Sequence, residues 1–156
     1  MNTTRRSFLK KSATAGAVGV AVSAGLISPR AVLAAWPKAA FEAKDLNAAM
    51  TAAIGSANTT ESGDIKLKAP DIAENGAVVP IEIKSKIAGT ESISLYVAEN
   101  ATPLAASFEL SDITEGFVVT RIKMGKTSDV IVVVKAGGKL YSTKKQVKVT
   151  IGGCGG

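Results

Sequence analysis

The stretch that decides the fold is VIVVVKAGGKLYSTKKQVKVTI, residues 130–151. Gly137 and Gly138 both tolerate a positive φ angle, so they predict a tight hairpin between strands at 130–135 and 139–151. A two-residue hairpin fixes how its strands are paired. The register of the last strand is therefore set, and so is the point at which the C-terminal tail leaves the sheet.

The two strands of this hairpin differ in their apolar pattern. Residues 130–134 are apolar at every position, which indicates either a central strand covered on both faces or a strand whose outer face meets a partner subunit. Near the end of the last strand Val147 and Val149 alternate with Lys148. This alternation is typical of one buried and one solvent-exposed face, and it anchors the end of the chain on the sheet.

Five more short runs rich in β-branched residues precede the hairpin. They lie at residues 65–68, 78–85, 92–98, 107–110 and 117–124. Seven strands spaced about ten residues apart predict a mainly β protein built as an antiparallel β-sandwich. Pro80 cannot donate a hydrogen bond to a neighbouring strand, so the run 78–85 is expected to be an edge strand or a bulged strand.

The run 92–98 shows the clearest alternation among these strands. Ile93, Leu95 and Val97 alternate with Ser94 and Tyr96. We therefore expect the isoleucine, leucine and valine side chains to face the core and the serine and tyrosine side chains to face solvent.

One amphipathic helix is predicted before the strands, at residues 41–54. Its apolar stripe consists of Phe41, Leu46, Ala49, Met50, Ala53 and Ile54. Gly55 follows the stripe and ends the helix, and the polar residues 56–63 read as a connecting loop.

The N-terminal 34 residues have the features of a twin-arginine export signal. Arg5 and Arg6 precede a weakly apolar run at 13–27, which at 15 residues is short for a membrane span. Residues 32–34 (Val-Leu-Ala) offer small-residue cleavage geometry. We expect residues 1–34 to be removed, a domain built from the helix and the β-sandwich at 35–151, a periplasmic location and no stable membrane anchor.

Charge and composition exclude several classes of function. The chain has 19 bases and 13 acids, but five bases and no acid lie in residues 1–34, so the mature chain has 14 bases against 13 acids, a net charge of +1. This balance does not favour a nucleic-acid partner. The chain has no histidine, which removes imidazole metal sites and Ser-His-Asp or Cys-His catalysis. We expect no metal, no cofactor and no catalytic residue.

The only cysteine stands in a glycine-rich C-terminal tail. Cys154 is flanked by Gly152 and Gly153 before it and by Gly155 and Gly156 after it. Glycines have no preferred conformation, so residues 152–156 predict a flexible arm that holds the thiol roughly 10 Å beyond the last apolar strand residue. A cysteine in such a tail has no helix terminus, metal or fixed cation to lower the pKa of its thiol, so an enclosing enzyme would have to activate it.

Three roles remain open for this thiol on the residues alone. It could attach a substrate covalently in a non-catalytic carrier, or it could form an interchain disulfide in a β-sandwich structural subunit. A thiol enzyme with a single cysteine is the third possibility, and the missing catalytic partners argue against it.

Three segments of the chain resemble the SoxY family, the carriers of sulfur compounds in bacterial thiosulfate oxidation. They are residues 71–80 (Asp-Ile-Ala-Glu-Asn-Gly-Ala-Val-Val-Pro), residues 120–124 (Thr-Arg-Ile-Lys-Met) and the ending 147–156 (Val-Lys-Val-Thr-Ile-Gly-Gly-Cys-Gly-Gly). The ending is the most specific of the three. The chain departs from the family at 99–103, where it reads Glu-Asn-Ala-Thr-Pro and the family often has an Asn-Pro element.

The resemblance implies an immunoglobulin-like β-sandwich that forms a heterodimer, or a higher oligomer, with a small SoxZ-like β subunit. It also implies that Cys154 carries the sulfur intermediates while three transient partners act on them. These partners are a haem cytochrome that joins thiosulfate to the cysteine, a hydrolase that releases sulfate, and a sulfane dehydrogenase. Haem and metals belong to those enzymes.

Export is the first property to test, because the twin-arginine pathway reads the arginine pair directly. Replacing Arg5 and Arg6 with Lys is expected to leave the precursor in the cytoplasm. Fractionation followed by immunoblotting measures this distribution. Mature protein at the normal level in the periplasm of the variant strain would contradict the assignment.

Overall fold

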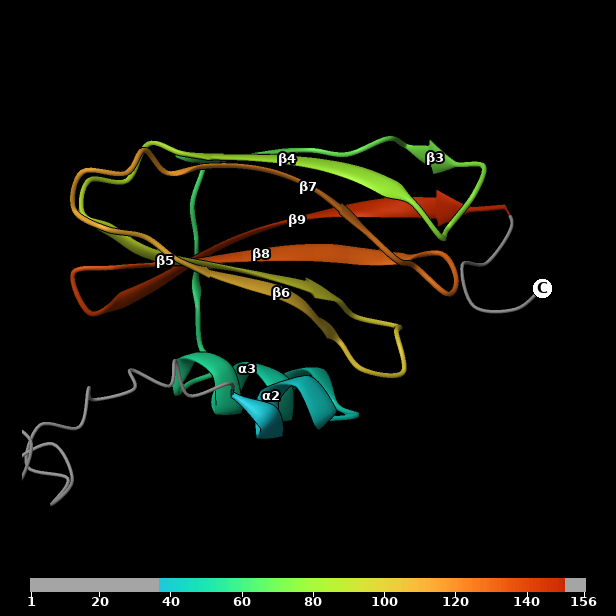
Figure 1. Ribbon diagram of the computed structural model, residues 1–156, viewed down its shortest axis with the longest axis horizontal. Helices are drawn as coiled ribbons and strands as arrows, with labels where there is room; N and C mark the ends of the chain where they lie inside the picture. The colour runs from blue at the N-terminus through green and yellow to red at the C-terminus, as the bar shows by residue number, and fades with distance from the viewer. Residues whose placement is uncertain (1–36, 151–156) are drawn as a thin grey trace, which may run out of the picture. The chain divides into compact units, whose positions relative to one another are not determined.

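The computed structural model describes residues 37–150, in which two short helices precede nine strands (Figure 1). The elements are α2 (Lys38–Glu42), α3 (Leu46–Ile54), β1 (Thr60–Glu61), β2 (Ile65–Lys68), β3 (Ile72–Ala73), β4 (Val79–Ser85), β5 (Thr90–Val97), β6 (Leu104–Glu109), β7 (Phe117–Ile122), β8 (Ser128–Ala136) and β9 (Lys139–Val149). The predicted leader 1–34 and the predicted arm 152–156 lie outside the described residues.

The strands form two open sheets. The larger sheet has the order β1-β9-β8-β5-β6, with β3 also paired to β9, and the smaller sheet has the order β2-β4-β7. Each of the seven predicted strands is present with bounds shifted by up to a few residues. The strands β1 and β3 were not predicted; they have two residues each and run parallel to β9, so the pairing is not purely antiparallel. The immunoglobulin-like connectivity stays a prediction.

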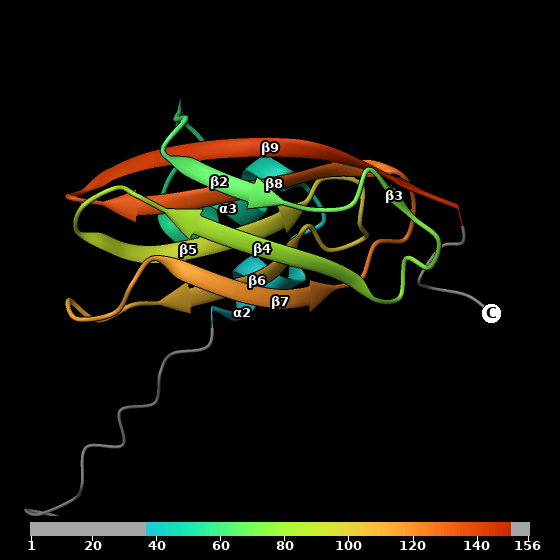
Figure 2. The same cartoon turned by 90° about the horizontal axis from the view of Figure 1, so that it is seen from above.

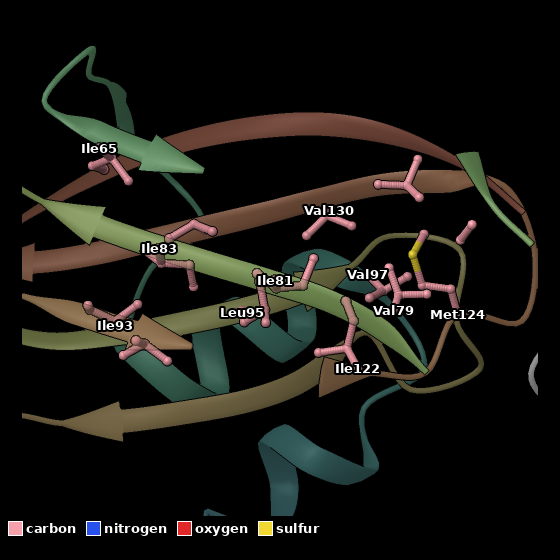
Figure 3. Packing of buried hydrophobic residues seen from close by; sticks show 14 of the residues in the cluster. Ile65, Val79, Ile81, Ile83, Ile93, Leu95, Val97, Ile122, Met124 and Val130 are labelled. Carbon is pink, nitrogen blue, oxygen red and sulfur yellow. The ribbon is translucent and has the colours of Figure 1, made fainter. Parts of the chain in front are cut away.

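One apolar core holds the two sheets together. Ile81 and Ile83 on β4 belong to the same buried cluster as Leu95 on β5 and Val130 and Val132 on β8, and all five side chains are at most 1% exposed (Figure 3). Burial of each aliphatic side chain of this kind stabilises the fold by about 1.5 to 3 kcal/mol before the loss of conformational entropy is counted. The alternation in β4 and β5 thus sets which side of each sheet faces inward.

The strand β8 is a central strand covered on both faces, which confirms the first of the two alternatives for residues 130–134. Val130, Val132 and Val134 point into the core between the sheets. Val133, on the opposite face, is 1% exposed and belongs to a second cluster with residues of α2 and α3. Both helices lie on this outer face of the larger sheet (Figure 1).

The face of β5 that we expected to be exposed to solvent is buried beneath the same helices. Ser94 and Tyr96 are both 0% exposed, although their alternation with apolar residues predicted exposure to solvent. Tyr96 packs in the second cluster beneath the helices, and the Ser94 hydroxyl is 3.1 Å from the Ser107 hydroxyl on β6. The prediction was wrong because it treated the outer face of the larger sheet as solvent-exposed.

The single helix predicted at 41–54 is two helices. Ala43 is extended, with ψ at 137°, and ends α2. Asp45 then caps α3, because its carboxylate accepts a hydrogen bond from the Ala48 amide at 3.0 Å. Gly55, at φ 84°, ends α3 as predicted. Among the described residues, none of the helices has the length and apolar character that a membrane crossing requires.

Pro80 lies in a central strand, so its assignment to an edge or bulged strand was wrong. β4 pairs with β2 on one side and with β7 on the other, and the β4–β7 register is continuous. The ladder with β2 stops where Lys68 meets Glu82, whereas Pro80 pairs with Arg121 on β7 alone. The proline is tolerated because β4 has a neighbour on only one side at this position.

The hairpin between β8 and β9 has the predicted form. Gly137 and Gly138 have φ angles of 54° and 71°, in the left-handed region that glycine favours. The pairing runs without a register shift from Ala136 opposite Lys139 to Ser128 opposite Val147.

Tyr96 generates a stability prediction. Its hydroxyl is buried without a hydrogen-bond partner among the described residues, and burial raises the pKa of Tyr96 to about 12. Tyr96→Phe is expected to change the free energy of unfolding by no more than about 1 kcal/mol near neutral pH, because no hydrogen bond is lost. The unfolded wild type releases the phenol proton near the ordinary tyrosine pKa of 10.0 and the folded chain near 12, so stability is retained below pH 10 and falls as the pH rises through this window.

Chemical denaturation at about pH 8 and about pH 11 measures this loss. The Tyr96→Phe variant is expected to lose less stability between the two pH values than the wild type does. Tyr141→Phe is the matched control, because Tyr141 is only partly buried. An equal loss in wild type and Tyr96→Phe would contradict the assignment.

Candidate functional site

The candidate site is the place where the C-terminal tail leaves the sheet, which we call the arm base and define as residues 148–150. Cys154 and its flanking glycines Gly152, Gly153, Gly155 and Gly156 lie outside the described residues, as do Arg5 and Arg6. The structure therefore describes how the body holds the chain four residues before the thiol.

The strand β9 enters the arm base with neighbours on both sides. It has 11 residues and pairs with β8 along one edge, up to Val147. On the other edge β1 pairs with the start of β9, and β3 pairs with its end, where Ile72 lies opposite Lys148 and Ala73 opposite Val149. Figure 2 shows β3 beside the end of β9, next to the point where the chain continues toward its C-terminus.

Hydrogen bonds from two separate loops hold the arm base. On the β3 side, the Lys148 amide donates to the Asp71 carbonyl at 3.0 Å and the Thr150 amide donates to the Ala73 carbonyl at 3.1 Å. On the other side, the Val149 amide donates to the hydroxyl oxygen of Thr127 at 3.0 Å. Successive amides thus point in opposite directions and each finds an acceptor.

Side chains add to this attachment. The Thr150 hydroxyl donates to the Glu74 carbonyl at 3.1 Å, and the Lys145 ammonium donates to the Ala69 carbonyl at 2.6 Å. The same ammonium lies 2.9 Å from the Asp71 carboxylate. Because Val147 is fully buried and Val149 packs against the core, the chain is fixed up to Thr150.

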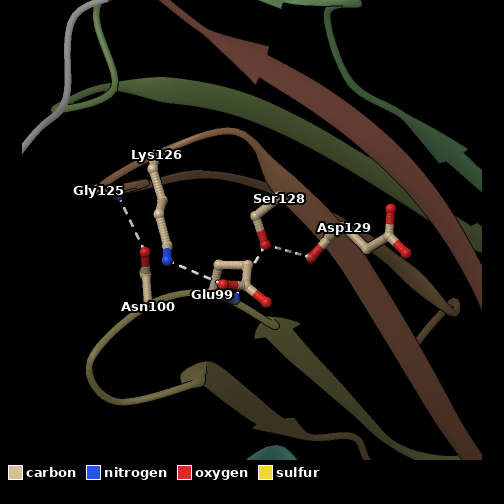
Figure 4. Close-up of polar contacts among 6 residues, drawn as sticks. All are labelled: Glu99, Asn100, Gly125, Lys126, Ser128 and Asp129. Carbon is tan, nitrogen blue, oxygen red and sulfur yellow. Dashed lines mark hydrogen bonds and ion pairs between the residues drawn. The ribbon is translucent and has the colours of Figure 1, made fainter.

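A polar network supports the loop that carries Thr127 (Figure 4). The Asn100 side-chain oxygen accepts from the Gly125 amide at 3.0 Å. The side-chain nitrogen of Asn100 donates to the Lys123 carbonyl at 2.8 Å. Lys126 lies 2.9 Å from the Glu99 carboxylate. The loop from 99 to 103, where the chain departs from the family pattern, therefore contributes to this support.

The described residues offer little chemistry of their own at the arm base. They contain no cluster of three or more His, Cys, Asp or Glu side chains suited to a metal ion. A hydrogen bond from Lys135 lowers the pKa of the Glu91 carboxyl, but Glu91 lies beside the Gly137–Gly138 turn at the opposite end of β8 and β9. The arm base can position a segment of chain.

Comparison with known proteins identifies the family. The family model described as "Sulfur oxidation protein SoxY" matches residues 50–154, more than half of the chain, and the match ends at Cys154. The chain belongs to the SoxY family. The match begins inside α3, so it includes all nine strands and the arm base.

A solved structure agrees with this assignment. The sulfur carrier protein SoxY from Chlorobium limicola f thiosulfatophilum is 44% identical, with a TM-score of 0.63, over 69% of this chain and 97% of that chain. The mainly β architecture with two small helices is thus the SoxY fold. No curated protein matches the chain.

Two other structures are less similar. An engineered protein is 11% identical, with a TM-score of 0.41, over 56% of this chain and 20% of that chain. A lytic polysaccharide monooxygenase from Jonesia denitrificans is 11% identical, with a TM-score of 0.38, over 60% of this chain and 58% of that chain. Neither similarity bears on the fold or the function of this chain.

The strand that leads to the arm base was predicted, but the residues that hold it were not. Residues 71–76 fall between the predicted strands 65–68 and 78–85, yet they contain β3 and three of the acceptors described above. Thr127 gave no signal at all, because a lone threonine in a loop has many possible partners. The alternation of Val147, Lys148 and Val149 was the only indication that the chain is anchored there.

Thr127 generates a prediction about local stability at the arm base. Thr127→Val removes the oxygen that accepts the Val149 amide, and it is expected to speed hydrogen exchange at that amide by up to about fivefold, corresponding to about 1 kcal/mol. Thr127→Ser keeps the oxygen and serves as the control. Exchange measured by mass spectrometry on the C-terminal peptide checks this, and equal exchange rates in the two variants would contradict the anchoring role.

Proposed function

We propose that this SoxY-family chain is a non-catalytic, covalent carrier of sulfur intermediates in periplasmic thiosulfate oxidation, with Cys154 as the attachment site. The observation that carries the proposal is the family match, which runs through the strands and ends on the sole cysteine of the chain. The 44% identical relative is itself described as a sulfur carrier protein.

The arm base supports this role physically. A carrier must keep its body still while it extends the thiol into the active sites of other proteins. Hydrogen bonds hold the chain up to Thr150, and from there four residues at about 3.3 to 3.6 Å each bring Cys154 roughly 13 to 14 Å from the anchored point. The glycines on both sides of the cysteine would let Cys154 point in many directions from the anchored residue.

The chemistry proposed for the thiol is a sequence of exchanges in which sulfur stays attached. A haem cytochrome accepts two electrons as Cys–SH and S₂O₃²⁻ give Cys–S–S–SO₃⁻ and one proton. A hydrolase then adds water, which releases SO₄²⁻ and a proton and leaves Cys–S–SH for the sulfane dehydrogenase. Each partner supplies the activation of the thiol for its own step.

Export and partnership complete the proposal. Residues 1–34 would direct the folded chain to the periplasm by the twin-arginine pathway, and a SoxZ-like β subunit would accompany it as a lasting partner. Residues 130–134 give no support for that subunit, because the chain itself covers them. The apolar surface available to a partner has to be sought elsewhere.

The competing role is a structural or interaction subunit linked through an interchain disulfide at Cys154. The two roles differ in the mass of the native protein. A carrier shows the chain plus a small sulfur adduct that a thiol reductant removes, whereas a disulfide-linked subunit shows the sum of two chains.

Substitution of the flanking glycines tests whether the thiol is delivered to enzymes or stands in the tail by accident. Replacing Gly153 and Gly155 with Val is expected to lower enzyme-dependent loading with thiosulfate by about tenfold or more, because the β-branched side chains restrict the backbone and widen the arm. Unfolding free energy is expected to change by less than about 0.5 kcal/mol, since these residues lie beyond the last strand. The adduct mass on the tail peptide, after incubation with the partner enzymes, measures loading.

Two controls make this test specific. Labelling of Cys154 by a small maleimide is expected to persist in the valine variant, which shows that the thiol is still exposed. Cys154→Ser is expected to abolish loading. Equal loading of wild type and the valine variant would show that the glycines are not a delivery arm, and loading of Cys154→Ser would remove the carrier proposal.

A further inference from the structure

The two sheets differ in what covers their outer faces. The helices α2 and α3 pack on the outer face of the larger sheet, through a cluster that includes Tyr96 and Val133. On the smaller sheet the outward side chains belong to β2, β4 and β7, and no described element packs over them (Figure 2). We call this surface the β2-β4-β7 face and define it by Lys66, Lys68, Pro80, Glu82, Lys84, Phe117, Val119 and Arg121.

The apolar and exposed part of the β2-β4-β7 face lies on β7 and around Pro80. Phe117 and Val119 on the outer strand β7 are 46% and 66% exposed, respectively. Pro80, Pro70 and Val119 line an open groove of about 340 Å³ that forms where β2 has ended and β4 continues. An exposed aromatic and aliphatic pair beside a groove is typical of protein interaction sites.

The outer strand adds a second reason for a protein to bind here. β7 pairs only with β4, so its other edge lacks a strand neighbour among the described residues. Unpaired edges that carry large apolar side chains promote association, and proteins usually cover or blunt them. Phe117 and Val119 are not the charged or proline residues that usually prevent association at such an edge.

The charge on the face is strongly one-sided. It carries four cations, Lys66, Lys68, Lys84 and Arg121, and one carboxylate, Glu82, which gives a net charge of +3. Glu82 already forms an ion pair within the face, because its carboxylate lies 2.6 Å from the Lys68 ammonium. Since the whole mature chain has 14 bases and 13 acids, this face holds a positive charge that the rest of the surface balances.

Two of these cations oppose each other. Lys66 lies directly across from Lys84 in the β2–β4 register, and like charges in such a position destabilise a sheet. Within residues 37–150, neither ammonium has an ion-pair partner, and neither does the Arg121 guanidinium. Carboxylates from another molecule would neutralise them.

We infer that the β2-β4-β7 face binds a protein partner that presents an apolar surface bordered by Asp or Glu side chains. Phe117, Val119 and Pro80 would supply the apolar contact, and Lys66, Lys84 and Arg121 would select the acidic border. A second copy of this chain does not fit, because two such faces would bring +3 against +3. The inference rests on the lasting partner proposed above and assigns the surface that this partner covers.

The test uses the mature full-length chain and the SoxZ-like subunit of the same organism as the probe. Val119→Ser is expected to raise the Kd of the complex about tenfold or more, because it removes an exposed apolar side chain that lines the groove. Lys84→Glu is expected to raise the Kd by a similar factor at low salt and to make binding less dependent on salt concentration. Isothermal titration calorimetry at about 50 and about 300 mM salt measures both effects.

Matched controls come from exposed positions that are not among the residues that define the face. Ile113, which is 96% exposed in the loop before β7, is changed to Ser, and Lys139, in the hairpin between β8 and β9, is changed to Glu. Both control variants are expected to bind within about twofold of wild type. Thermal unfolding of all four variants checks that the fold is intact.

Several results would overturn the inference. They are wild-type affinity in both Val119→Ser and Lys84→Glu, the absence of any complex with wild type, and a change confined to self-association in sedimentation. Binding of wild type, but not Val119→Ser, to vesicles with about 30% phosphatidylglycerol would also overturn it, in favour of a membrane surface. Loading of Cys154 is measured separately, so the carrier proposal can stand when this surface assignment fails.

Discussion

The two-sided burial of β8 is the constraint on which the rest of the structure depends. A strand that is apolar on both faces needs other elements packed on both faces. In this chain a different element covers each face. The smaller sheet covers Val130 and Val132, and the helices cover Val133. The turn at Gly137 and Gly138 then places β9 alongside β8, and β9 delivers the end of the chain to the arm base.

Much of this arrangement could be predicted from local pattern, because strands and turns have local causes. All seven predicted strands exist, and the glycine pair makes the predicted turn. The errors share one origin, which is that burial depends on neighbours distant in the sequence. The helices bury Ser94 and Tyr96, and the early end of β2 lets Pro80 lie in a central strand. No window of residues around either site contains that information.

The candidate site divides in the same way. The prediction of an arm at residues 152–156 rests on a chemical pattern in the sequence itself, a lone cysteine among glycines, and it stays a prediction. The arm base was not predictable, because its acceptors are backbone carbonyls of Asp71, Ala73 and Glu74 and one hydroxyl of Thr127. Carbonyl groups are present in every residue and leave no mark on composition. Membership of the SoxY family links the two parts, since the family match includes both β3 and Cys154.

The parallel pairing of β3 with the end of β9 has a mechanical consequence. When another protein grips the tail and pulls, the force acts along the axis of β9. The hydrogen bonds to β3 and β8 run across that axis, so the pull strains them in shear, and they have to yield together. A tail attached at a strand edge by a loop would peel away one bond at a time. A pull along the axis of β9 would therefore meet hydrogen bonds that have to break together.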